Sequence, residues 1–100
     1  MLERDFQPEL KRAIAARFPG CEILKQDANQ RQGIPDLLVL WGRHWALLET
    51  KRGFRSRNQP NQPHYVEKFG EMSFSAFVNP DNYLDVLDEM ERAFLNDVPV

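Results

Sequence analysis

The chain has 100 residues, of which 42% are hydrophobic, 11% aromatic and 28% charged. This length holds one domain with a single modest core, and the apolar content excludes an intrinsically disordered chain. No apolar run approaches the roughly 20 residues that a membrane span needs, and residues 1–5 lack the layout of a signal peptide. The single cysteine, Cys21, allows no internal disulfide. We therefore expect a cytoplasmic protein.

The formal net charge is −2, but the charges are unevenly distributed. Residues 81–97 are acidic, with Arg92 as the single cation. Residues 43–57 are basic, with Glu49 as the single acid, and their cations are Arg43, Lys51, Arg52, Arg55 and Arg57. Such a local patch suits binding to phosphate, although Arg55 and Arg57 alone would also fit an ordinary solvated loop.

The first part of the chain predicts one helix. Apolar residues recur at helical spacing over residues 3–18, as Phe6, Leu10, Ile14 and Phe18. Pro8 is tolerated in a first turn, which predicts a regular helix that starts near residues 5–7. Pro19-Gly20 ends it. Residues 21–25 then predict a short strand, and the polar residues 26–32 predict a loop.

Residues 33–51 predict a hairpin of two apolar strands. The turn is expected at Gly42-Arg43, between Trp41 and Trp45. Because Leu, Val and Trp follow one another with little polar alternation, we expect both strands to be buried on both faces.

The second half of the chain predicts a Pro/Gly/Asn-rich loop over residues 52–63, whose last residues lead into a helix that starts at Asn61 or Gln62. A strand at 74–78 follows, and a last helix begins after Asn79-Pro80-Asp81. The order is therefore α-β-β-β-α-β-α over one domain, residues 1–100. That order predicts an α/β fold with a central mixed sheet flanked by helices.

Three charged residues lie at the margins of this hairpin. A turn at Gly42-Arg43 pairs Asp36 with Glu49, and Glu49 and Lys51 project from the same face of their strand. Two carboxylates lie close together at little cost only when a cation compensates their repulsion. Carboxylate oxygens suit Mg²⁺ or Mn²⁺, which bind through one or two carboxylates plus substrate phosphate. The pattern predicts metal-assisted phosphodiester hydrolysis in which Lys51 stabilises developing negative charge.

The segments Gly33-Ile34-Pro35-Asp36 and Glu49-Thr50-Lys51 resemble the signature of the PD-(D/E)XK nuclease superfamily. Within it, the chain resembles small phage-type VRR-NUC domains, and Glu49-Thr50-Lys51 is also similar to phage junction resolvases of the endonuclease I type. The resemblance runs from Glu3 to about Val78. It implies a restriction-endonuclease-like fold and a Mg²⁺- or Mn²⁺-dependent DNA endonuclease in a bacterial or phage-infected cell.

The resemblance also assigns roles. Asp36 and Glu49 would ligate the metal, Lys51 would be the catalytic lysine, and the Thr50 carbonyl would be a further ligand. An early helical Glu completes the set; Glu3 matches it better than Glu9 does, with both left open. A catalytic Gln opens the later helix, where Gln62 matches better than Gln59.

The expected substrate is branched or structured DNA, such as a Holliday junction or a flap, bound with the help of Arg43, Arg52, Arg55 and Arg57. The expected assembly is a homodimer that uses Trp41, Trp45 and Phe54. Two alternatives are a non-catalytic nucleic-acid-binding or assembly module on the same fold, and a small structural domain whose acids form salt bridges. His44 and His64 are expected to be surface residues.

Overall fold

The computed structural model describes residues 3–27, 31–51 and 61–96, with the backbone alone for residues 3–5. Its elements are α1 (Glu3–Arg17), β1 (Glu22–Lys25), β2 (Leu37–Trp41), β3 (His44–Thr50), α2 (Gln62–Met72), β4 (Phe74–Val78) and α3 (Tyr83–Leu95). The predicted order of elements is confirmed. The helix α1 begins at Glu3, earlier than expected, so Pro8 lies inside it and not in its first turn.

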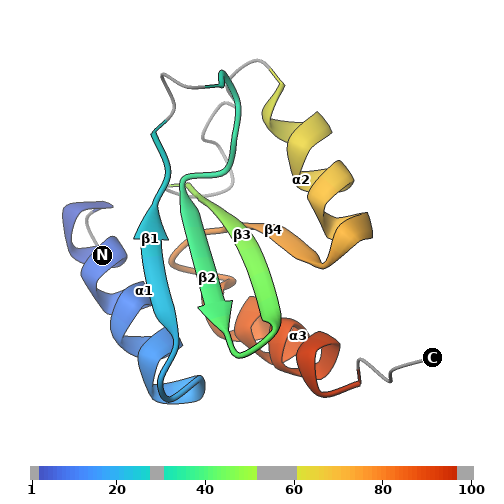
Figure 1. Ribbon diagram of the computed structural model, residues 1–100. Helices are drawn as coiled ribbons and strands as arrows, with labels where there is room; N and C mark the ends of the chain where they lie inside the picture. Colours follow the sequence, from blue (N-terminus) through green and yellow to red (C-terminus); the bar gives the residue numbers. More distant parts are fainter. Residues whose placement is uncertain (1–2, 28–30, 52–60, 97–100) are drawn as a thin grey trace.

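The four strands form one mixed sheet in the order β1-β2-β3-β4 (Figure 1). The first three strands pair antiparallel, and a tight turn joins β2 to β3, with Leu37 opposite Leu48. The strand β4 pairs parallel with β3. A parallel pair needs a crossover between its strands, and α2 lies in that crossover.

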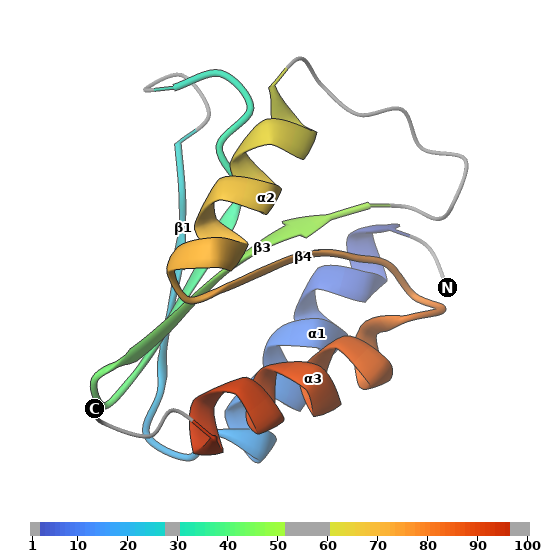
Figure 2. The ribbon, with the colours of Figure 1, turned by 90° about the vertical axis from the view of Figure 1, so that its right-hand side faces the viewer.

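Helices cover both faces of the sheet. The ribbon seen from the side has α1 and α3 together on one face and α2 on the other (Figure 2). The helix α1 buries Phe6, Leu10 and Ile14 completely, because side chains four residues apart form one stripe, and Phe18, just after the helix, continues it. The helix α3 adds a matching stripe that contains Leu87 and Met90. These stripes and the sheet form the core.

The two hairpin strands differ in burial, against expectation. In β3 the run from Ala46 to Glu49 is buried throughout, because helices lie on both of its faces. In β2 the residues Leu37 and Val39 are buried, whereas Leu40 is 38% exposed. The prediction that both strands are buried on both faces is therefore right for β3 and wrong for β2. The helix α2 packs over β3 and β4 and leaves the same face of β2 uncovered.

The ends of the elements follow local chemistry. Gly20 and Gly42 have φ of +85° and +62°, which glycine adopts without steric cost, and they lie in the turns after α1 and between β2 and β3. Before α3, the Asn79 side chain accepts hydrogen bonds from the backbone N–H groups of Asp81 and Asn82 at 2.8 and 2.9 Å. None of the helices in the described ranges is long and apolar enough to cross a membrane.

Candidate active site

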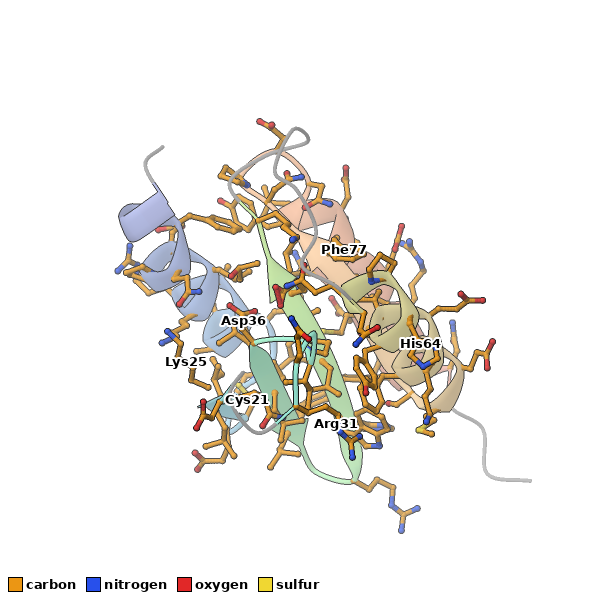
Figure 3. The ribbon with its side chains drawn as sticks, turned by 90° about the horizontal axis from the view of Figure 1, so that it is seen from above. Cys21, Lys25, Arg31, Asp36, His64 and Phe77 are labelled. Carbon is orange, nitrogen blue, oxygen red and sulfur yellow. The ribbon has the colours of Figure 1, made fainter. Side chains whose placement is uncertain are left out.

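The candidate site lies at the end of the sheet where β2 begins and β3 ends. Leu37 is paired with Leu48, so the residues next to them, Asp36 and Glu49, lie side by side. Figure 3 looks down on this end of the sheet and shows Asp36 between α1 and α2. The predicted pairing of these two acids across the hairpin agrees with the observed register.

The carboxylate of Asp36 is held by two neighbours. Its Oδ1 accepts the backbone N–H of Thr50 at 3.0 Å, and its Oδ2 accepts the Thr50 hydroxyl at 2.6 Å. The Gln7 side chain amide, from α1, donates to Asp36 Oδ2 at 3.1 Å and to Thr50 Oγ1 at 3.0 Å. Both carboxylate oxygens are therefore oriented by the protein. Sequence reasoning missed Gln7, although it lies four residues after Glu3 in the same helix.

A second amide, from α2, joins the remaining two charged residues. Gln62, only 6% exposed, is the first residue of α2. Its Nε2 donates to Glu49 Oε2 at 2.6 Å, and its Oε1 accepts from Lys51 Nζ at 2.6 Å. The structure thus brings Glu49, Lys51 and Gln62 together as predicted, with Gln62 between the acid and the base.

Lys51 lies just beyond the end of β3 and is fixed at both ends. Its backbone N–H donates to the Val78 carbonyl at 2.7 Å, which extends the pairing with β4. Its Nζ also lies 5.6 Å from the centre of the Phe77 ring, at cation–π distance. These contacts hold the ammonium group at the edge of the site.

The electrostatics of the site are concentrated in Glu49. The pKa of Glu49 is raised from 4.5 to about 7, first by burial and second by the negative charge of Asp36. The charge of Lys51 and a hydrogen bond from the Asp36 backbone act against this shift. Glu49 is 6% exposed, so a cation at this position would replace the lost hydration of both acids.

The donor set fits a hard divalent cation in type, through the oxygens of Asp36 and Glu49. Among the described side chains, no three His, Cys, Asp or Glu gather at one place. Of the two candidates for a further acid, Glu3 has a side chain outside the described residues. Glu9 lies about 160° around α1 from Gln7, the residue that reaches Asp36, and Glu9 Oε2 pairs with Arg12 at 2.9 Å. Glu9 is therefore not directed at Asp36.

Not every predicted site residue reaches this end of the sheet. Arg43 is exposed in the β2–β3 turn, at the opposite end of the seven-residue β3 and therefore roughly 20 Å from Glu49. Arg43 therefore does not lie beside Asp36 and Glu49, and its expected role as a DNA contact stays a prediction. The other predicted DNA contacts, Arg52, Arg55 and Arg57, lie outside the described residues, as do Gln59 and Phe54.

The aromatic residues at the hairpin turn pack within the chain. Trp41 lies edge-on to Phe18 at 5.1 Å between ring centres, and its Nε1 donates to the Pro19 carbonyl at 3.0 Å. His44, half-buried, stacks on Phe94 at 5.1 Å, so it is not the exposed turn residue that was expected. Trp45 lies 6.4 Å from the Phe69 ring. Both tryptophans are thus half-buried by contacts within the chain, and their expected role in a dimer stays a prediction.

His64 is exposed on α2, as expected, and its ring lies 5.2 Å from that of Tyr65.

Comparison with family models, with curated proteins and with solved structures finds no match to this chain.

Proposed function

We propose that this chain is a Mg²⁺- or Mn²⁺-dependent endonuclease that hydrolyses phosphodiester bonds in DNA. The observation that carries the proposal is Glu49. A buried carboxyl group whose pKa is raised to about 7, beside a second acid, destabilises the fold whenever it ionises. Carboxyl groups perturbed in this way are concentrated at functional sites. A purely structural role would be served better by a neutral side chain, since a buried charge costs several kcal/mol.

In this proposal Asp36 and Glu49 hold the metal, with Glu3 and the Thr50 carbonyl as expected further ligands. The bound metal would polarise the scissile phosphate and lower the pKa of a coordinated water. The chain does the rest. Gln7 and Thr50 fix the direction of the Asp36 oxygens, so that this ligand needs no rearrangement.

Lys51 would stabilise negative charge that develops on the phosphate. Its Nζ is held by the Oε1 atom of Gln62, which fixes the position of the ammonium group beside the two acids. Gln62 in turn positions Glu49 through the second end of the same amide. We propose Gln62 as the residue that sets the separation between the ligand Glu49 and the cation Lys51.

The substrate proposed is branched or structured DNA, a junction or a flap, cut by a homodimer that supplies two sites at a fixed separation. This part rests on the sequence resemblance and on the general need for paired cuts. Arg52, Arg55 and Arg57 remain the expected phosphate contacts.

The experiment is a cleavage assay on labelled junctions, flaps and duplexes with Mg²⁺, Mn²⁺ or EDTA. We expect metal-dependent cleavage that is lost in Asp36→Ala, Glu49→Ala and Lys51→Ala, with circular dichroism spectra unchanged. Glu67→Ala, an exposed acid on α2, is the matched control and should cut as wild type. Folded protein that binds DNA but cuts none of the panel would favour the non-catalytic module. Cleavage by Asp36→Ala within a few-fold of wild type would refute the assigned site.

A further inference from the structure

The face of β1 and β2 on the side of α2 carries leucines that the fold leaves uncovered. Leu24 is paired with Leu38, and Leu38 with the buried Leu47 of β3, so all three point to the same face. Leu40, paired with Trp45, belongs to this face too. Leu24 is 46% and Leu40 38% exposed. These leucines of β1 and β2 together form an exposed apolar area on the sheet.

Aromatic side chains continue this area toward α2. The Tyr65 and Phe69 rings stack at 5.7 Å with an angle of 15° between their planes. Phe69 contacts Trp45 at right angles, 6.4 Å between centres. All three are half-buried, so each has part of its ring in solvent. We call the set the leucine–aromatic surface; it consists of Leu24, Leu38, Leu40, Trp45, Tyr65 and Phe69.

One cation, Arg31, borders the leucine–aromatic surface at the end nearest the candidate site. The Arg31 guanidinium lies over the Tyr65 ring, with its carbon 5.8 Å from the ring centre. The Arg31 carbonyl accepts the Ile34 N–H at 3.3 Å across a turn in which Gly33 has φ of +88°. Figure 3 shows Arg31 on the side of the sheet that α2 occupies. The arginine is therefore placed by a turn of defined geometry, five residues before Asp36.

The charged residues of α2 also place a cation, and not an acid, nearest to this surface. At 100° per residue, Lys68 lies about 60° around the helix axis from Tyr65, whereas Glu71 and Glu67 lie about 120° and 160° away. Of the charged residues on α2, the cation is thus nearest to the leucine–aromatic surface. Glu22, paired with Leu40, places one exposed acid on this face at the end far from Asp36. The apolar and aromatic area therefore complements a flat, apolar ligand whose anionic groups lie next to Arg31 and Lys68.

We propose that the leucine–aromatic surface, with Arg31, binds an unpaired DNA strand that leads to or from the candidate site. Bases in a duplex are stacked on each other, and only an unpaired strand presents base faces and phosphates together. Tyr65 lies one helical turn from Gln62, so the strand would reach Glu49 and Lys51 directly. The inference rests on the proposed function and narrows its substrate to DNA with a single-stranded segment.

The test measures binding by fluorescence anisotropy in EDTA, so that the full-length chain binds without cutting. The probes are a labelled oligothymidylate and a blunt duplex of equal length. We expect the single strand to bind more tightly, and Tyr65→Leu and Leu40→Glu each to weaken its binding roughly tenfold. Tyr65→Leu keeps an apolar contact with Phe69. Leu84→Glu, at a leucine of α3 that is 54% exposed on the other side of the molecule, is the matched control and should bind as wild type.

Tighter binding to the duplex, or unchanged single-strand affinity in both variants with unchanged melting temperatures, would overturn the inference. So would a dimer of the wild type that Leu40→Glu converts to a monomer, because a second copy would then occupy the surface. The inference and the proposed function fail separately. Metal-dependent cleavage with wild-type strand binding in both variants refutes only the surface. Strand binding that depends on Tyr65 and Leu40, without cleavage of any substrate, refutes only the catalysis.

Discussion

The pKa of Glu49 makes a quantitative prediction about stability. In the folded chain this pKa is about 7, against 4.5 for an unperturbed side chain. Between these two values the folded state binds the proton more tightly than the unfolded state, so stability falls as pH rises. The contribution is fully present below pH 4.5 and is lost as pH rises through 7. The difference of about 2.5 between the two pKa values corresponds to about 3 kcal/mol of folding free energy, at 1.36 kcal/mol for each pKa unit.

The substitution Glu49→Gln removes this dependence, because a glutamine cannot ionise and still offers an oxygen to Gln62. We expect the variant to match wild type near pH 4 and to be more stable by about 3 kcal/mol at pH 8, in the absence of divalent metal. That difference is a large part of the 5–15 kcal/mol typical of a domain. Urea denaturation of both proteins at each pH measures it.

The comparison between the two proteins cancels the titration of all other groups. Glu67→Gln, at an exposed position on the same helix as Gln62, controls for the loss of a negative charge as such, and its difference from wild type should stay flat with pH. A Glu49→Gln difference that is independent of pH, or that grows toward acid, would refute the assigned burial and repulsion.

Other tests address the metal, the clamp and the assembly. Excess Mg²⁺ at pH 8 should stabilise wild type by about 2.7 kcal/mol at 100 times its Kd, and should leave Glu49→Gln unchanged; equal stabilisation of both would contradict the ligand assignment. Gln7→Ala should weaken Mn²⁺ binding roughly tenfold in calorimetry without changing the fold, as is typical of groups that orient a ligand; wild-type affinity would make Gln7 a bystander. Replacing Arg52, Arg55 and Arg57 with Ala should weaken binding equally across sequences and lower its salt slope; a loss for one sequence alone would indicate base readout. Sedimentation at micromolar concentration should give a dimer; a monomer of 11.7 kDa with and without DNA would contradict the paired-site proposal.

The sequence predicted the order of elements because each element carries its own periodic signal. The four-residue spacing from Phe6 to Phe18 and the turn at Gly42 are local signals, and the structure has the helix and the turn that they predict. The burial of β2 could not be predicted in this way, since it depends on where α2 lies. Leu38 and Leu40 of β2 are the same residue type as the buried Leu47 and Leu48 of β3, so the sequence does not distinguish the two strands. The path of the crossover decides that α2 covers β3 and not β2.

In the candidate site, too, the residues that local sequence places could be predicted, and those that depend on the packing of distant elements could not. Asp36 and Glu49 were predictable as neighbours, because a hairpin fixes its register through the turn. Gln7 was not, because the helical phase that points to Glu3 also includes Gln7 four residues later, and periodicity does not tell which of the two side chains reaches Asp36. Glu9, the weaker of the two candidates for a further acid, is directed away from Asp36 by the helix phase.

The hydrogen bonds of the site span very different lengths of chain, and this bears on the order in which the protein folds. The bonds among Glu49, Lys51 and Gln62 close loops of 11 and 13 residues, whereas those of Gln7 join residues 29 and 43 apart. Closing the longest loop costs about 1 kcal/mol more entropy than closing the shortest. We therefore expect the hairpin and α2 to associate early, and α1 to dock on Asp36 late. A chain from which α1 has transiently detached would keep both acids and the Thr50 contacts of Asp36 but lose the Gln7 contact, so local opening of α1 would weaken the metal site while the sheet remains folded.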